Sequence, residues 1–297
     1  MTSTAKSDFK LIKRVKDPKF EIDNLHHYTL ALQIGIYDFQ LCVIDGRSGN
    51  VLYFEDFKLE NIKTVNTRLK VLHSLFDRHH FLTAGFWNSV KVSIKSHKFS
   101  LVPIDHFLET SASDYLVINS EVKPNMEEVL FYKHQSSEVV NVFAVDRKLL
   151  SWIKSMYPAI AVQIAHQGSA LMEGIMNYQD LGTEKKMFCN VDRGILHIIV
   201  TENKKLLYYN QFAARQSEDY LKYVMTVFKE VGLSPKKHAI RMWGSLKQQS
   251  KHVELLKKYF RDIQYAGKPK NLLFSHAFDE IPDYHYFDTY GTYLCGQ

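Results

Sequence analysis

Short apolar runs separated by polar turns dominate this chain, and they occur twice in the same order. Each half holds three runs rich in β-branched and aromatic residues, joined by turns that contain Gly, Asn or Asp. Such runs predict antiparallel strands. The predicted strands are residues 30–36, 39–44 and 51–57 in the first half and residues 187–192, 195–201 and 206–212 in the second.

The third run of each half aligns without a gap, which indicates an internal duplication. Four residues of the first half correspond to four of the second at a constant offset of 155. They are Leu52, Tyr53, Phe54 and Phe57, matched with Leu207, Tyr208, Tyr209 and Phe212. A helix is predicted after each third run, because apolar residues recur at helical spacing over residues 64–78 and 217–230. Asn61 or Thr64 is a candidate cap for the first of these helices.

Both halves then continue as strand, helix, strand and helix. We place these elements at residues 139–144, 146–156, 159–164 and 167–178, and at residues 239–243, 246–260, 262–265 and 284–294. Asp146 precedes the first of these helices as a candidate cap. Residues 81–137 have no counterpart in the second half, so we predict an inserted subdomain there, with a small hairpin at residues 90–94 and 99–102.

The fold class predicted from these patterns is α/β, with two βββαβαβα lobes and a small insertion in the first lobe. The predicted divisions are a basic N-terminal arm (1–24), a first lobe (25–184, with the insertion at about 81–137) and a second lobe (185–297). Residues 179–186 are the expected connection, with Gly182 as its flexible point.

Composition fits a globular protein with a substantial core. A chain of 297 residues is long enough to bury roughly three-quarters of its unfolded surface without disulfides or metals. The formal net charge is +6, of which +4 falls in residues 1–20. This arm is either a solvated tail, a weak attractant for nucleic acid or anionic surfaces, or an edge strand, since Phe9, Leu11 and Val15 alternate with charges.

Several functional classes lack their sequence signatures. Three isolated cysteines, with no C-x-x-C pair, fit a reducing compartment, and neither a leader segment nor a membrane span is predicted. We therefore expect a cytoplasmic protein. The pairs His26-His27 and His79-His80 have no ligand spacing around them, so no metal site is predicted, and the serine-hydrolase, P-loop and Rossmann motifs are missing.

Taken together, the two halves, the insertion in the first and the turn Asp192-Arg193-Gly194 resemble the actin-like ATPase superfamily, whose lobes are ribonuclease-H-like. That superfamily includes actin, sugar kinases and heat-shock chaperone ATPase domains. The bacterial cell-division and pilus-assembly branch is similar in carrying its insertion in the same half. More narrowly, residues 25–296 resemble an uncharacterised domain family of Bacteroidetes with this fold.

The resemblance implies a nucleotide cleft lined by six candidate positions, which are Gly35, Asp192, Gly194, Gly244, Ser245 and Gly291. In the superfamily, each first hairpin turn cradles phosphates with backbone amides, and a carboxylate orients magnesium-bound water.

Several matching positions depart from the superfamily pattern. Gln33 replaces the acidic residue of the first turn, and Ile36 replaces its hydroxyl residue. Leu196 and His197 replace a glycine and a threonine in the second turn, and Trp243 replaces one glycine of the adenosine-side pair. A neutral Gln33 cannot hold a magnesium shell as a carboxylate does. Trp243 would either crowd the purine site or stack on the base.

These departures predict a catalytically degenerate actin-like protein that acts by binding a protein partner or a copy of itself. No catalytic residue and no cofactor are predicted, and ATP with magnesium is disfavoured. The alternative is an atypical nucleotide-dependent ATPase or phosphotransferase that uses Asp192, with charge from Arg193 and from Lys95 or Lys247. A third hypothesis is nucleic-acid association through the basic arm.

Overall fold

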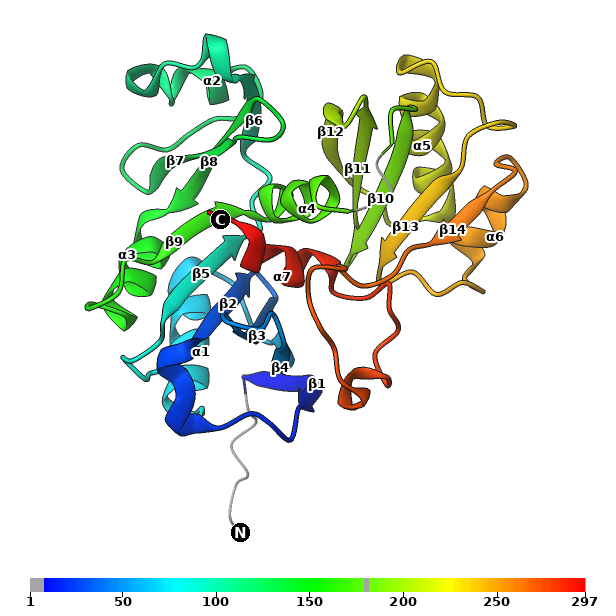
Figure 1. Cartoon of the computed structure of the whole chain (residues 1–297). Coiled ribbons are helices and arrows are strands. Elements are labelled where there is room, and N and C mark those ends of the chain that lie inside the picture. Colours follow the sequence, from blue (N-terminus) through cyan, green and yellow to red (C-terminus); the bar gives the residue numbers. More distant parts are fainter. Residues whose placement is uncertain (1–7, 179–181, 297) are drawn as a thin grey trace.

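The computed structural model describes residues 8–178 and 182–296, which form two lobes and a smaller unit attached to the first (Figure 1). The strands are β1 (Phe9–Lys16), β2 (Tyr28–Ile34), β3 (Asp38–Asp45), β4 (Val51–Leu59), β5 (Ser89–Ile94), β6 (Phe99–Pro103), β7 (Glu127–His134), β8 (Val139–Asp146), β9 (Gln163–His166), β10 (Lys186–Asp192), β11 (Ile195–Glu202), β12 (Lys205–Ala213), β13 (Ile240–Gly244) and β14 (Ile263–Tyr265).

Seven α-helices and five short 3-10 helices accompany these strands in the described residues. The α-helices are α1 (Val65–Arg78), α2 (Asp114–Val117), α3 (Arg147–Met156), α4 (Gln167–Met176), α5 (Ser217–Glu230), α6 (Lys251–Lys257) and α7 (Phe287–Gly291). The 3-10 helices are η1 (Ile22–His27), η2 (Ile104–His106), η3 (Glu109–Ser111), η4 (His276–Phe278) and η5 (Thr292–Leu294). Among residues 8–178 and 182–296, no helix has the length and apolar content needed to cross a bilayer.

The two main sheets have the same topology, so the predicted duplication is confirmed. The first sheet has the order β1-β4-β3-β2-β5-β9, and the second has the order β12-β11-β10-β13-β14. Apart from β1, each strand of the first sheet has its equivalent in the second. In both sheets three antiparallel strands are followed by two strands that run parallel to the first of them.

The extra strand β1 comes from the predicted basic arm. It pairs antiparallel with β4, and the ring of Phe9 lies edge-on to Phe57 at 6.0 Å. Of the three predictions for the arm, the edge strand is therefore correct for residues 9–16. Residues 1–7 of the arm lie outside the described part. The predicted lobe limits stay predictions, and the predicted connection 179–186 falls partly on residues 179–181, which are also outside the described part.

The assignment of strands around the insertion was wrong at two places. The strand β5, predicted as part of an inserted hairpin, lies in the main sheet between β2 and β9. The strand β8, predicted as a main-sheet strand, is the central strand of a separate sheet with the order β6-β8-β7. Apolar and polar residues alternate in β5 as in a hairpin strand, yet the ammonium of Lys91 is buried and donates to the carbonyls of Tyr293 and Cys295 at 2.7 and 2.6 Å.

Helix starts follow the side chains that cap them. Thr64 accepts a hydrogen bond from the amide of Thr67 at the start of α1, and Asp146 accepts from the amides of Lys148 and Leu149 at the start of α3, as predicted. The helix α6 is shorter than the predicted 246–260, because its cap is Ser250 rather than a residue near Leu246.

The last helix of each lobe packs on the opposite lobe. Leu171 and Ile175 of α4, which follows the first sheet, share a core with Phe188 and Trp243 of the second. Tyr290 of α7, which follows the second sheet, joins a core that includes Ala31 and Phe54 of the first. The two helices also contact each other between the lobes (Figure 1). This exchange of helices fixes the relative position of the lobes.

The contact between α4 and α7 depends on glycine at position 291. A Cβ atom built on Gly291 would lie 2.2 Å from the carbonyl oxygen of Ala170, a distance that a side chain cannot tolerate. Ala170 belongs to the backbone of α4, so relief would require a shift of a whole helix. The small residue therefore permits the close approach of the two helices.

We expect Gly291→Ala to lower the free energy of unfolding by about 1–3 kcal/mol or more, because the added methyl group overpacks a helix contact. Gly85→Ala is the matched control, since a Cβ at that position meets nothing within 4 Å. Urea unfolding followed by tryptophan fluorescence measures both. Equal midpoints for the two variants would contradict this account of the contact.

Candidate functional site

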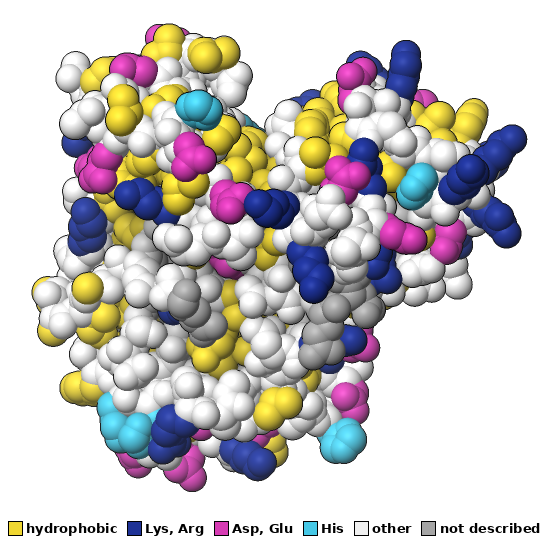
Figure 2. All heavy atoms as spheres, turned by 45° about the horizontal axis from the view of Figure 1, so that its top comes forward, with side chains coloured by type: hydrophobic (Ala, Val, Ile, Leu, Met, Phe, Trp, Pro, Cys, Tyr) yellow, Lys and Arg dark blue, Asp and Glu magenta, His cyan; other side chains and the backbone are white. Residues whose placement is uncertain are grey.

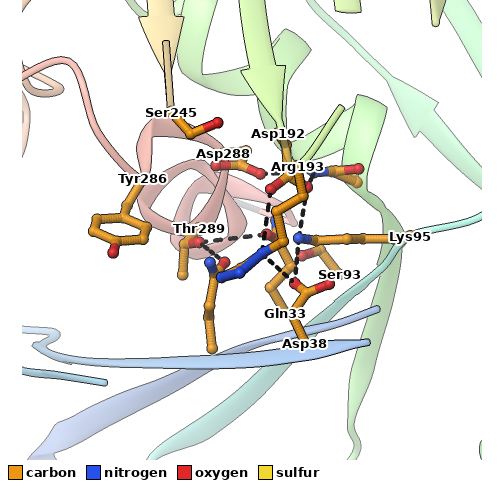
Figure 3. Close-up of polar contacts among 12 residues, drawn as sticks. Gln33, Asp38, Ser93, Lys95, Asp192, Arg193, Ser245, Tyr286, Asp288 and Thr289 are labelled. Atoms are coloured by element: carbon orange, nitrogen blue, oxygen red, sulfur yellow. Dashed lines mark hydrogen bonds and ion pairs between the residues drawn. The ribbon is translucent and has the colours of Figure 1, made fainter. Parts of the chain in front are cut away.

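The candidate site lies where the first hairpin turns of the two lobes face each other (Figure 3). In the first lobe, Gly35 donates its amide to the carbonyl of Asp38 at 2.9 Å, which closes the turn between β2 and β3. In the second lobe, Arg193 and Gly194 both adopt positive φ angles, 47° and 84°, between β10 and β11. Two such residues are typical of a tight type I′ hairpin turn. The turn directs the Arg193 side chain toward the first lobe.

Four buried aspartates from both lobes meet two cations at this place. The aspartates are Asp38, Asp56, Asp192 and Asp288. The first two and Asp288 are at most 5% exposed, and the side chain of Asp192 is 13% exposed. The cations are Lys95, which follows β5, and Arg193. We call these six residues the interlobe charge cluster.

Each cation of the cluster binds carboxylates from more than one element. The ammonium of Lys95 pairs with Asp38 of its own lobe and, at 2.6 Å, with Asp192 of the second lobe. The guanidinium of Arg193 pairs with Asp56, and its Nε lies 3.6 Å from the nearest oxygen of Asp38. Figure 3 shows Lys95 between Asp192, which descends from the second lobe, and Asp38, which rises from the first. The cluster therefore links the lobes electrostatically.

Neutral donors complete the coordination of the carboxylates. The amide of Gln167, at the start of α4, donates to Asp192 and to Asp288 at 2.7 Å each. Asp56 accepts from Gln40 and from the hydroxyl of Tyr286, both at 3.2 Å. The acidic oxygens are thus satisfied largely by the protein itself.

Burial and the neighbouring charges have opposite effects on the pKa values of the ionisable groups in the cluster. Burial raises the pKa of Asp38 and of Asp288. Burial also opposes ionisation of Asp192, but Lys95, Arg193 and the hydrogen bond from Gln167 together outweigh burial and lower the pKa of Asp192. Burial disfavours the Lys95 ammonium, yet Asp192 and Asp38 outweigh burial and raise its pKa. A charged Lys95–Asp192 pair is therefore the stable centre of the cluster.

Three of the six predicted positions, Asp192, Gly244 and Ser245, line a common pocket of about 230 Å³. The cluster residues Asp56, Arg193 and Asp288 and the side chains of Gln40 and Tyr286 also line it. This volume is below the roughly 300–1,000 Å³ typical of pockets for small molecules and cofactors. A nucleoside triphosphate would therefore need the pocket to widen.

The other three predicted positions serve local packing. Gly35 makes room for the cluster, because a Cβ there would lie 2.3 Å from a carboxylate oxygen of Asp38. Gly194 supplies a positive φ angle in its turn. Gly291 supports the contact between α4 and α7. Ile36, expected beside the phosphates, does not line this pocket but a larger one on the first lobe.

The segment that would face adenosine is occupied by internal contacts. The amide of Gly244 donates to the carbonyl of Tyr284 at 2.6 Å, and the amide of Ser245 donates to Val191 at 2.7 Å. Trp243 is only 1% exposed, stacks on Phe287 at 4.3 Å and donates its indole N–H to a backbone carbonyl. The indole is part of the core between the lobes, so it offers no exposed face on which a base could stack.

Sequence reasoning missed Asp38, Asp56, Asp288 and Gln167, whereas it named Lys95 and Arg193 as possible sources of charge. Asp56 follows Glu55 in a strand whose only exposed residue is Lys58, and a charged residue in a buried strand requires a partner. That was the available signal. Lys247, the other suggested cation, is exposed and is not part of the cluster. Within the ranges that the structure describes, no group of three or more His, Cys, Asp or Glu residues is arranged to hold a metal ion.

A second set of hydrogen-bonded polar side chains is connected like a hydrolase triad, but its serine is not accessible to a substrate. His134 of β7 lies 2.7 Å from Glu173 and 3.0 Å from the hydroxyl of Ser169, both on α4. Catalysis by such a chain requires an exposed serine oxygen. Ser169 and His134 are both completely buried, so the chain ties the inserted sheet to α4.

The Lys95 ammonium pairs with the buried carboxylates of Asp38 and Asp192, which would otherwise lose their shared cation. We expect Lys95→Met to lower the free energy of unfolding by about 3–5 kcal/mol, the usual cost of removing one partner of a buried ion pair. Lys58→Met is the control, because Lys58 is exposed and its pair with Glu60 spans 3.4 Å. Urea titration of both variants provides the measurement, and a Lys95→Met variant as stable as Lys58→Met would be inconsistent with a structural role for the cluster.

His197 predicts a pH dependence of stability. It is completely buried beside Tyr209, and burial lowers its pKa from 6.5 to about 3. Between pH 6.5 and about pH 3, His197 is protonated in the unfolded chain but neutral in the folded chain. Protonation therefore favours the unfolded chain, and the free energy of unfolding falls as the pH drops below 6.5. We expect His197→Phe to reduce that slope by about 1.4 kcal/mol per pH unit relative to the parent. Unfolding curves at several pH values measure this slope. His106→Phe is the control, because His106 is exposed and its replacement should leave the slope unchanged. An unchanged slope in His197→Phe would contradict the role given to His197.

Comparison with known structures identifies the architecture. A Bacteroides thetaiotaomicron protein described as having an actin-like ATPase fold and unknown function is similar, with 22% sequence identity and a TM-score of 0.74 over 83% of this chain and 93% of that one. A structure of the PilM-PilN type IV pilus biogenesis complex is also similar, with 10% identity and a TM-score of 0.58 over 90% of this chain and 97% of that chain. The chain therefore has the actin-like ATPase fold.

Sequence comparison identifies the family. A comparison of the sequence with curated proteins finds no match. Residues 17–263 match the family described as "Protein of unknown function (DUF3822)", which is most of the sequence. The chain belongs to this family.

Proposed function

We propose that this protein is a catalytically degenerate member of the actin-like fold that acts by binding a protein partner or a second copy of itself, without ATP turnover. The observation that carries the proposal is the interlobe charge cluster. Lys95 and Arg193 bind the carboxylates of the cleft, so these carboxylates are not free to bind a metal ion. Displacing these cations would leave buried charges unpaired, which is costly.

The alternative, an atypical ATPase or phosphotransferase, would need Asp192 as its acid or base. One oxygen of Asp192 is already bound by Lys95 at 2.6 Å and by Gln167 at 2.7 Å. The adjacent pocket of about 230 Å³ is small for a nucleotide. These contacts disfavour the alternative, because a productive complex would have to break them first.

Charge distribution indicates the chemistry of the proposed partner. Residues 185–265 contain sixteen Lys and Arg against seven Asp and Glu, a formal charge of +9. Figure 2 shows Lys and Arg side chains projecting from the end of the second lobe, on the right. A surface of one sign steers partners of the opposite sign. We therefore favour a partner with an acidic face; the PilM-PilN complex is a precedent for a chain of this fold in a protein assembly.

The basic arm is a weaker basis for nucleic-acid association than its composition implies. Lys13 pairs with Glu280 at 2.9 Å, and Arg14 pairs with Glu55. Lys16 lies over the ring of Phe20 at 5.6 Å. These side chains are engaged by the folded body, which reduces the charge that β1 offers to a polyanion.

Thermal unfolding with and without millimolar magnesium-ATP tests the proposal. We expect no change in the unfolding temperature, because the charge cluster and the small pocket exclude the triphosphate. A ligand present at about 100 times its dissociation constant would add about 2.7 kcal/mol of stability and be readily seen.

An upward shift, together with magnesium-dependent hydrolysis that Asp192→Ala abolishes, would favour the phosphotransferase alternative. Sedimentation analysis of the same sample separates the two binding modes. A concentration-dependent dimer would point to self-association, and a stable monomer to a different partner.

A further inference from the structure

We infer that a pocket on the first lobe, beside the start of α1, binds a small amphiphilic anion, that is, an apolar molecule carrying one carboxylate or phosphate group. The pocket has a volume of about 510 Å³, within the range of small-molecule sites. It lies where the turn after β2, the start of α1, the segment after β5 and the end of β8 meet. It is therefore at the junction of the first lobe with the inserted sheet.

A buried arginine lines the pocket without a complete set of partners. Arg68 of α1 is only 8% exposed, and its Nε has no hydrogen-bond partner among the residues described. A buried guanidinium group that is not fully hydrogen-bonded carries an unrecovered desolvation cost. An anion in the pocket would provide the missing acceptor.

Asp146 is the acidic group that interacts with Arg68, but its carboxylate already has another role. One oxygen of Asp146 accepts from the amides of Lys148 and Leu149 at 2.9 and 3.1 Å, which caps α3. A capping carboxylate is held in place by those amides. Asp146 therefore attracts Arg68 at a distance while no hydrogen bond joins the two side chains in the described structure.

The start of α1 adds to the positive potential. This helix has 14 residues, and its capping box uses the amide of Thr67. Val65 lines the pocket, and its amide is one of the first-turn amides that have no partner within a helix. The positive end of the helix dipole favours an anion at this position.

The remaining charges of the pocket leave a single positive excess. Lys95 is bound by the interlobe charge cluster, and Lys98 pairs with Glu127 at 2.7 Å. With Arg68 set against Asp146, the exposed Lys63 remains as the additional cation. A ligand with one anionic group matches this balance, whereas a polyphosphate would not.

The pocket walls call for an apolar body on the ligand. Ile36 and Tyr37 line the pocket and are 45% and 59% exposed, although large apolar side chains are normally covered. Ile62 and Leu149 also line it, from other elements of the lobe. An apolar group placed between them would remove these side chains from water, at a gain of roughly 25 cal/mol per Å² buried.

Titration calorimetry with octanoate and octyl phosphate tests the inference and separates the two headgroups. We expect at least one of them to bind at millimolar concentration, and both uncharged octanamide and inorganic phosphate to bind at least about tenfold more weakly. Arg68→Met should weaken binding about tenfold or more, because a hydrogen bond to a charged group is lost. Arg68→Lys should retain part of the affinity, and Lys70→Met, an exposed change on the same helix, should retain all of it.

Unfolding of Arg68→Met without ligand provides an independent measurement. An arginine held for a ligand should cost stability, so this variant should unfold at or above the temperature of the parent. A markedly less stable Arg68→Met would overturn the inference, since Arg68 would then serve the fold. Failure of both amphiphiles to bind, equal binding of octanamide or phosphate, or unchanged binding by Arg68→Met would also overturn it. None of these outcomes depends on whether the interlobe cleft binds ATP.

Discussion

The burial of acidic side chains from both lobes against two cations is the constraint on which the rest of this structure depends. Asp38 and Asp56 come from the first lobe, and Asp192 and Asp288 from the second. Carboxylates cannot be buried together unless cations and hydrogen-bond donors neutralise them. Lys95 and Arg193 meet this requirement only while the lobes are closed on each other. The cluster therefore couples the relative position of the lobes to the satisfaction of buried charge.

Packing between the lobes acts in the same direction as the charges. The helices α4 and α7 each cross to the opposite sheet, and Gly291 lets their backbones approach closely. Gln167, the first residue of α4, donates to Asp192 at the end of β10 and to Asp288 in the first turn of α7. The same helix start thus contributes both to the apolar contact and to the charge cluster. Opening the cleft would disturb both together.

The proposed function implies that this protein uses the cleft of the shared fold differently. The hairpin turns that could cradle phosphates are present, but here they bring charged side chains of the protein itself together. A fold permits many functions, and the residues at the site decide among them. Here the acidic and basic side chains of the interlobe charge cluster bind one another, so we look to the outer surfaces of the molecule for ligands and partners. The pocket beside Arg68 differs in this respect, because its polar groups are not all satisfied.

The sequence by itself determined the duplication, most strands and the starts of α1 and α3. Those features depend on local patterns: alternating apolar runs, the constant offset of the third strands, and capping side chains at Thr64 and Asp146. It also identified Asp192, Gly244 and Ser245 as neighbours through a resemblance of motifs. Only the tertiary structure decided which sheet β5 and β8 join, because the burial of Lys91 depends on carbonyls about 200 residues away. The charge cluster was likewise beyond the sequence, since the partners of Asp38, Asp56 and Asp288 come from distant segments that meet only when the two lobes pack together.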